Sequence, residues 1–181
     1  MKLTTQEILM SAFAGESQAH MRYLHFAEIA EKEGFPNVAR LFRAVAFSEQ
    51  VHAINHLKNL GHLKGGFLTV AHATFGPGNT SKNLELAIMG EEYEVEEMYP
   101  IYIEIAKMQN EKRAEMSFRW ALESEKRHAE LYRKAKETVD SGKDAPFGKI
   151  YVCGVCGYTV EGEVPDRCPV CGAPKEKFKE F

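Results

Sequence analysis

The chain has 181 residues, of which 44% are hydrophobic and 27% are charged, and its formal net charge is −3. This length allows one substantial core and a small second unit, while the weak negative charge gives no general attraction to nucleic acid or to an anionic membrane. The first residues lack the pattern of a secretory signal, and no run approaches the roughly 18 apolar residues of a membrane helix. We therefore expect a cytoplasmic protein.

Two long helices are predicted at the start of the chain. Apolar residues recur with helical spacing over roughly 5–33, where Thr4 and Glu7 have the spacing of a capping box, and a second helix follows from Pro36. The segment 61–79 is rich in glycine and has no sustained helical pattern. A connection of this length fits the crossover of a ferritin-like four-helix bundle.

Two further helices are predicted after this connection. The third is expected to begin after Thr80 or Ser81 and to end near Met108, with a kink at Pro100, whose ring is incompatible with a regular helix interior. The fourth is expected from about Asn110 to Asp140. The predicted fold is therefore mainly α, with its bundle over 1–142.

The second and fourth helices carry the same motif, Ser-Glu-x-x-His-Ala, 76 positions apart. Residues at i and i+3 share one helix face, so each copy can aim a carboxylate and an imidazole at one spot. The four residues are Glu49, His52, Glu125 and His128. Glu16 and Glu91, each preceded by glycine, lie upstream of the two copies and are expected to bridge two metal ions. These two Gly-Glu pairs are 75 positions apart, so the repeat contains a one-residue slip.

A seventh candidate ligand is Glu94, which shares a helix face with Glu91. Several buried carboxylates would be untenable without cations to offset their desolvation. Tyr23 and Tyr99 lie about two turns beyond the Gly-Glu glutamates and are expected to pack in the core, to hydrogen-bond the ligand carboxylates, or both. The other histidines are expected to be ordinary core or surface residues. They are His20, His25, His56, His62 and His72.

All four cysteines lie near the C-terminus, as two Cys-x-x-Cys pairs separated by 11 residues. They are Cys153, Cys156, Cys168 and Cys171. Two such pairs predict a tetrahedral thiolate cage, which suits zinc or a single iron. Gly157 and Gly172 follow the pairs, where the chain must turn sharply. Tyr151 and the sequences around the cysteines resemble rubredoxin, which favours iron. The sequence thus predicts a linker over 143–148 and a metal-stapled domain over 149–181.

Three bundle segments and this tail together resemble the rubrerythrin family, and the resemblance extends over essentially the whole chain. The segments are 12–17, 96–100 and 125–132. It implies a non-haem di-iron centre held by the seven bundle residues Glu16, Glu49, His52, Glu91, Glu94, Glu125 and His128, and a mononuclear FeS4 iron held by the four cysteines. It also implies a homodimeric peroxidase that reduces hydrogen peroxide to water, with electrons from a rubredoxin or a NAD(P)H-dependent reductase.

Two alternatives stay open from the residues. A ferroxidase or iron-handling protein would use the same bundle with oxygen as its oxidant, and an interaction module stapled by zinc would leave the duplicated motifs without a role.

His128 lies at least 12 residues before the linker, about 18 Å of helix. We therefore predict a head-to-tail dimer in which electrons cross between subunits. We also predict, as a separate matter, that Glu94 replaces His52 at one iron on oxidation.

Overall fold

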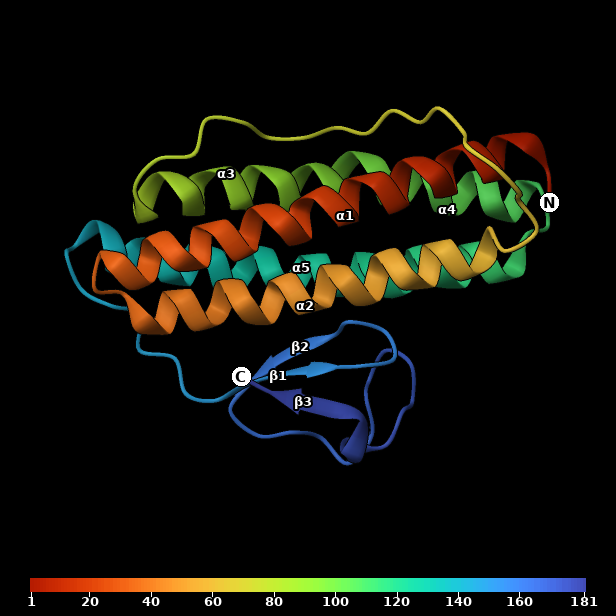
Figure 1. Ribbon diagram of the computed structural model, residues 1–181. Helices are drawn as coiled ribbons and strands as arrows, with labels where there is room; N and C mark the ends of the chain where they lie inside the picture. The colour runs from red at the N-terminus through yellow and green to blue at the C-terminus, as the bar shows by residue number, and fades with distance from the viewer.

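The computed structural model describes residues 1–181 and consists of a four-helix bundle followed by a small three-stranded domain (Figure 1). The bundle contains α1 (Leu3–Lys32), α2 (Pro36–Asn59), α3 (Thr80–Tyr93), the π-helical segment η1 (Glu94–Met98), α4 (Tyr99–Met108) and α5 (Lys112–Asp140). Because α3, η1 and α4 are continuous, they form the third helix of the bundle. None of these helices is long and apolar enough to cross a membrane.

The helix ends differ from the prediction in three places. The capping box at Thr4–Glu7 was wrong: α1 begins at Leu3, and the backbone N–H of Thr5 donates to Gln109 Oε1 at 3.1 Å, so the turn before α5 supplies the acceptor. Asn110 adopts a left-handed conformation with φ of 57°, which delays the start of α5 to Lys112. Helix α3 is capped one residue earlier than expected, by the Asn79 side chain.

The one-residue slip in the repeat takes the form of the π-helical segment η1. Tyr23 follows Glu16 by seven residues, whereas Tyr99 follows Glu91 by eight, and the wide turn over 94–98 absorbs the extra residue. Both tyrosines remain buried, with 1% and 0% exposure. The disturbance expected at Pro100 is thus a π turn just before the proline, where a wider turn relieves the clash of its ring.

The glycine-rich segment 61–79 runs along the outside of the bundle over α1 and α3, as a crossover connection does (Figure 1). Ser11 Oγ donates to the Val70 carbonyl at 2.7 Å and Gln18 Nε2 to the His72 carbonyl at 3.1 Å. These bonds tie the connection to α1. The crossover expected from the sequence is therefore present within this chain.

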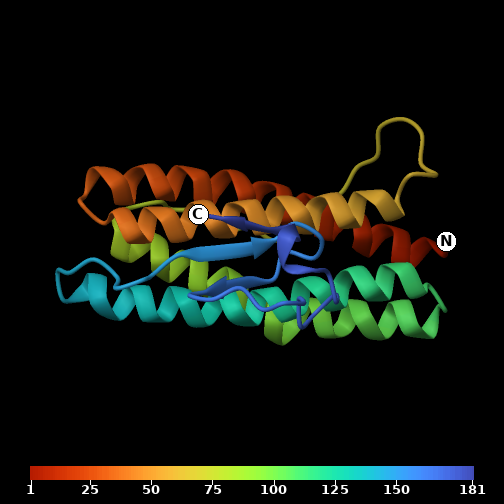
Figure 2. The same cartoon turned by 90° about the horizontal axis from the view of Figure 1, so that it is seen from below.

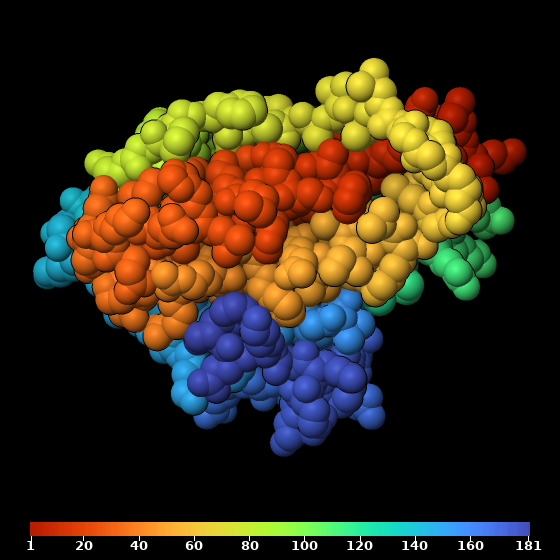
Figure 3. All heavy atoms as spheres, in the orientation of Figure 1, coloured from red at the N-terminus to blue at the C-terminus, as the bar shows by residue number.

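The C-terminal domain is an antiparallel sheet with strand order β2-β1-β3, which lies against α2 and α5 (Figures 2 and 3). Its strands are β1 (Ile150–Cys153), β2 (Thr159–Glu161) and β3 (Phe178–Glu180), and the short 3₁₀ turn η2 (Lys175–Lys177) precedes the last. Ile150 and Val152 are fully buried and belong to the same apolar cluster as the bundle core. The small domain therefore shares the core of the bundle.

The segment expected to be a simple linker packs closely on the bundle. Asp144 accepts hydrogen bonds from the backbone N–H of Asn37 at 2.9 Å, where it caps α2, and Arg40 donates to the Phe147 carbonyl at 2.8 Å. Ala145 and Phe147 are buried. These contacts turn the chain back along the bundle, so the small domain reaches His128 although the linker lies about 18 Å of helix beyond that residue.

Candidate metal centres

Six of the seven predicted bundle ligands meet at the centre of the bundle, in two overlapping groups. The first group is Glu16, Glu49, His52 and Glu125, and the second is Glu49, Glu91, Glu125 and His128. Within each group the ligand atoms lie within 4.8 Å of one another, and every member is at most 1% exposed. The two Glu-x-x-His motifs therefore face each other, as their duplication predicted.

The carboxylates shared by the two groups are Glu49 and Glu125, not the pair Glu16 and Glu91 that we expected to bridge the metals. Helices α2 and α5 are in contact, and the glutamate of each motif comes between the two histidines. Glu16 and Glu91 each belong to one group only. They complete opposite ends of the cluster.

Both imidazoles present Nδ1 to the carboxylates. His52 Nδ1 lies 2.8 Å from Glu125 Oε1 and 3.1 Å from Glu49 Oε2, and His128 Nδ1 lies 2.6 Å from Glu125 Oε2. The Nε2 atoms point toward the C-terminal domain, where His128 Nε2 meets Thr159 Oγ1 at 2.9 Å. A hydrogen bond on the distal nitrogen orients a metal-binding imidazole.

The donor set fits two cations. Five buried atoms of the cluster have no hydrogen-bond partner, namely Glu16 Oε2, Glu91 Oε2, Glu125 Oε1, Glu125 Oε2 and His128 Nδ1. They approach other ligand atoms without hydrogen-bond geometry, as ligands around a shared ion do. Without a cation, burial and the neighbouring carboxylates raise the pKa of Glu49 well above its usual range. Carboxylate oxygens and imidazole nitrogens are a typical donor set for iron.

Tyr23 and Tyr99 hold ligand carboxylates, as expected, but each holds the ligand of the other half of the repeat. Tyr23 on α1 donates to Glu91 Oε1 at 2.7 Å, and Tyr99 on α4 donates to Glu16 Oε1. Both rings are buried in the core. Each phenol therefore orients a carboxylate across the bundle, and Glu16 keeps its other oxygen free for a metal.

Glu94 is the one predicted ligand outside both groups. It lies in the π-helical segment and lines a small cavity of about 30 Å³ with Gly15 and Gly90. Burial, followed by the charges of Glu16 and Glu125, raises its pKa well above the usual range. The charges of the cluster thus act on the Glu94 carboxylate, but Glu94 belongs to neither group of ligands.

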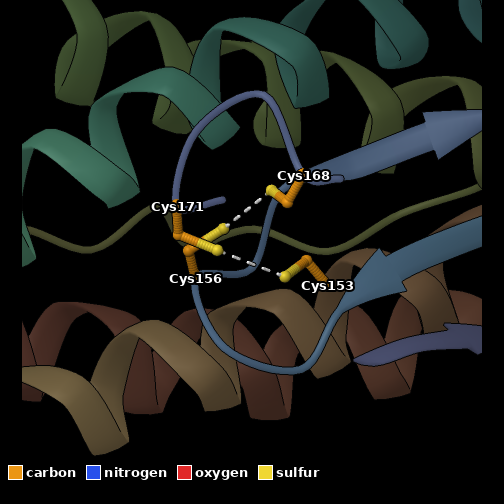
Figure 4. Close-up of side chains that lie close together, drawn as sticks. All are labelled: Cys153, Cys156, Cys168 and Cys171. Atoms are coloured by element: carbon orange, nitrogen blue, oxygen red, sulfur yellow. Dashed lines mark hydrogen bonds between the residues drawn. The ribbon is translucent and has the colours of Figure 1, made fainter. Parts of the chain in front are cut away.

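The four cysteines come together at one end of the small domain, and their sulfurs point toward a common centre (Figure 4). Cys153 Sγ lies 3.7 Å from Cys171 Sγ, and Cys156 Sγ lies 3.5 Å from Cys168 Sγ. The thiol of Cys156 and backbone N–H groups lower the pKa of Cys153 to about 5. The cage expected from the spacing is present, and it suits one tetrahedral metal ion.

Gly157 and Gly172 turn the chain after each cysteine pair with φ of 86° and 74°, as predicted. Gly157 has a second role, because a Cβ there would lie 2.1 Å from His52 Nε2. Its carbonyl accepts a hydrogen bond from Ser48 Oγ at 2.6 Å. The residue after Cys156 is therefore in direct contact with Ser48 and His52, in the Glu-x-x-His motif region of α2.

Three residues near the centres were not predicted to take part. His56, expected to be an ordinary histidine, is buried 3.8 Å from Glu16 Oε1, and its position four residues after His52 on the same helix face was the available signal. Trp120 packs against the cysteine cluster, and Thr159 contacts His128. No sequence pattern indicated these two contacts, because they depend on how the domains dock.

Comparisons with known proteins agree with this geometry. The rubrerythrin family model matches residues 7–136, and the model of the rubrerythrin rubredoxin-like domain matches residues 151–179. Rubrerythrin-2 of Clostridium acetobutylicum is 47% identical over 98% of this chain and 96% of its own length. A structure of fully reduced, all-ferrous nigerythrin superposes with a TM-score of 0.85 at 33% identity, covering 98% of this chain and 86% of that one. The M. penetrans ferritin, at 18% identity and a TM-score of 0.64, is similar in fold over 78% of this chain and 88% of its own. The predicted ferritin-like bundle with a rubredoxin-like domain is confirmed.

Proposed function

The chain belongs to the rubrerythrin family, and from this premise we propose that it is a non-haem di-iron peroxidase. It reduces hydrogen peroxide to water, in defence against oxidative stress, with electrons delivered through its own four-cysteine iron. The observation that carries this proposal is the contact of the four-cysteine domain with both histidine motifs, through Gly157 and Thr159.

The ligands divide among three iron ions. Glu16 and His52 would bind one iron of the pair, Glu91 and His128 the other, and Glu49 and Glu125 both. The mononuclear iron would take Cys153, Cys156, Cys168 and Cys171. When bound, the iron pair supplies two electrons together to one peroxide, and the four-thiolate iron supplies electrons one at a time.

The protein groups hold this centre electrically neutral and dry. The four carboxylates of the cluster match the charge of two ferrous ions, and their burial excludes bulk water. Tyr23 and Tyr99 fix the outer carboxylates, and Thr159 fixes the ring of His128. We propose that Glu94 provides a further carboxylate in exchange for His52 when the charge of the pair rises, because harder ions prefer anionic oxygen.

Electron delivery is proposed to occur within one subunit. The Cys156 carbonyl lies 3.5 Å from Ser124 Oγ, and the next residue, Gly157, is bonded to Ser48. The backbone of Cys156 thus contacts the motif on α5, and the backbone of the next residue, Gly157, contacts the motif on α2. This short route removes the reason for electrons to cross between subunits. The homodimer, its head-to-tail arrangement, the cytoplasmic location and a rubredoxin or NAD(P)H-dependent reductase as donor remain predictions.

Peroxide consumption by the iron-loaded protein tests the proposal. With a reductase and NAD(P)H we expect steady turnover of peroxide, faster than that of oxygen, with the iron retained. Cys156→Ser should lose turnover with this donor, while its chemically reduced iron pair should still react with peroxide. A ferroxidase would instead prefer oxygen and release ferric mineral. That result, or unchanged turnover in Cys156→Ser, would refute the proposed function.

A further inference from the structure

His56 is a fully buried histidine that belongs to neither metal group, and it lies in an unbroken line of hydrogen bonds. Ser117 Oγ lies 2.8 Å from His56 Nδ1, and His56 Nε2 lies 3.2 Å from the Tyr99 hydroxyl. Tyr99 in turn donates to Glu16 Oε1. Ser117 is 4% exposed and lines a surface cavity of about 410 Å³ between α2, α5 and the C-terminal domain. The line therefore joins solvent to an outer carboxylate of the cluster.

The hydrogen bonds in this line all point the same way. Tyr99 has one hydroxyl proton, which it gives to Glu16, so its oxygen accepts from His56 Nε2–H. In a neutral ring the other nitrogen, Nδ1, is then bare and accepts from the Ser117 hydroxyl. Each group is thus a donor toward Glu16 and an acceptor from the solvent side.

The other half of the repeat lacks this line. The position 76 residues after His56 is Tyr132, whose buried hydroxyl has no partner, and the position 76 residues before Ser117 is Leu41. Tyr23, the counterpart of Tyr99, packs among the rings of Phe42 and Tyr132. This line of polar groups therefore has no counterpart in the other half of the repeat.

We propose that Ser117, His56 and Tyr99 conduct protons from the surface cavity to Glu16. The inference rests on the proposed peroxidase function, in which each peroxide takes up two electrons from the iron pair and two protons from solvent to give two waters. For each proton delivered, Glu16 gains the Tyr99 proton, Tyr99 the Nε2 proton of His56, and His56 Nδ1 the Ser117 proton, which cavity water replaces. The ring is left in its other tautomer, protonated on Nδ1, and must return to the first by proton exchange with water before the next transfer, because rotation of the ring moves no proton between its nitrogens. Ser117 and His56 are positioning residues that act through Tyr99.

The first test is independent of activity and reads the tautomer of His56. In the full-length protein loaded with zinc in place of iron, ¹⁵N NMR of the histidine rings should find His56 protonated on Nε2 and bare on Nδ1. A ring protonated on Nδ1, or on both nitrogens, would overturn the proposal, because Ser117 could then no longer donate to it. This reading does not depend on peroxide chemistry.

The second test is kinetic and uses the reduced, iron-loaded protein mixed once with peroxide. His56→Gln can keep both hydrogen bonds but cannot pass a proton readily, and Ser117→Ala removes the entry step. Both should slow oxidation of the iron pair by about 10-fold or more and change its solvent deuterium isotope effect, since a positioned proton donor commonly contributes about 100-fold. Ser117→Thr, which keeps the hydroxyl, and His20→Gln, a histidine outside the line, should react like the wild type.

Wild-type rates and isotope effects in both Ser117→Ala and His56→Gln would overturn the proposal, as would a slow His56→Gln beside a fast Ser117→Ala. If His56→Gln binds less iron, Ser117→Ala still decides the outcome, because Ser117 contacts no ligand. A wild-type iron pair that fails to react with peroxide would instead refute the proposed function.

Discussion

Substitution of Gly157 by alanine should separate the two metal centres without removing a ligand from either. The new Cβ would lie 2.1 Å from His52 Nε2 and 2.7 Å from Ser48 Oγ, whereas ordinary contacts begin at 3.4 Å. An overlap of 1.3 Å, the difference between 3.4 and 2.1 Å, must therefore be relieved, and we expect the small domain to move away from α2, because the His52 ring is buried among the ligands. The four cysteines and the seven bundle residues remain unchanged.

The size of the effect follows from the contacts that are lost. The bonds from Ser48 to the Gly157 carbonyl and from His128 to Thr159 contribute about 1 kcal/mol each. A loss of about 2 kcal/mol lowers the ratio of docked to undocked domain by about 30-fold. If electrons pass only in the docked state, their transfer should slow by up to about 30-fold.

Gly172→Ala is the matched control, because Gly172 has the same place after the second cysteine pair and a φ of 74°, with nothing within 4 Å of an added Cβ. Both variants carry the backbone cost of a left-handed alanine, about 1–2 kcal/mol. The assay mixes fully reduced protein with peroxide and follows reoxidation of the coloured four-cysteine iron. Equal rates in Gly157→Ala, Gly172→Ala and the wild type would refute the role assigned to this contact.

Four further predictions concern the ligand cluster and its link to the small domain. Thr159→Val should weaken iron binding at the His128 end about 10- to 100-fold in a chelator competition, whereas Thr138→Val on α5 should not; equal affinities would contradict a role for the Thr159 hydroxyl. Glu94→Ala should still bind two ferrous ions but should be oxidised by peroxide more slowly than Glu97→Ala, whose residue is exposed, and crystals with His52 bound in both redox states would exclude the exchange. In chemical denaturation, the metal-free protein should lose stability as the pH rises from 5 to 8. Burial raises the pKa of Glu91 to about 7, and the charge of Glu125 raises the pKa of His128 to about 10 against the effect of burial, so both groups bind more protons in the folded state. A stability that rises over this range would contradict these two pKa shifts as the cause. Mixed dimers of a Cys156→Ser subunit and a Glu49→Ala subunit should remain inactive if electrons stay within one chain, and regained activity would support transfer between head-to-tail subunits.

The ligands of both centres were predictable because their arrangement is local. The spacing of Glu49 and His52 is one turn of helix, so secondary structure alone brings carboxylate and imidazole to one face. The pairs Cys153 with Cys156 and Cys168 with Cys171 likewise form their half-sites within four residues. The one-residue slip of the repeat also marked where the π-helical segment lies, between Glu91 and Tyr99.

The arrangement within the ligand set depends on tertiary packing, and the sequence pattern did not predict which carboxylates the two groups share. Glu49 and Glu125, rather than Glu16 and Glu91, are shared because α2 and α5 face each other, and no spacing along one helix encodes which helix lies opposite. The crossed bonds of the two tyrosines have the same origin.

The placement of the small domain was decided by contacts between residues about 100 positions apart. Asp144 caps α2, Phe147 is buried beside it, and Gly157 fits against His52 only because it has no side chain. The six residues 143–148, which we interpreted as a simple linker, show no periodic pattern that would predict such packing. Helical spacing therefore determined which residues form the candidate ligand set, while the packing of distant segments determined which carboxylates the two groups share, which imidazole nitrogens face them and how the two candidate centres meet.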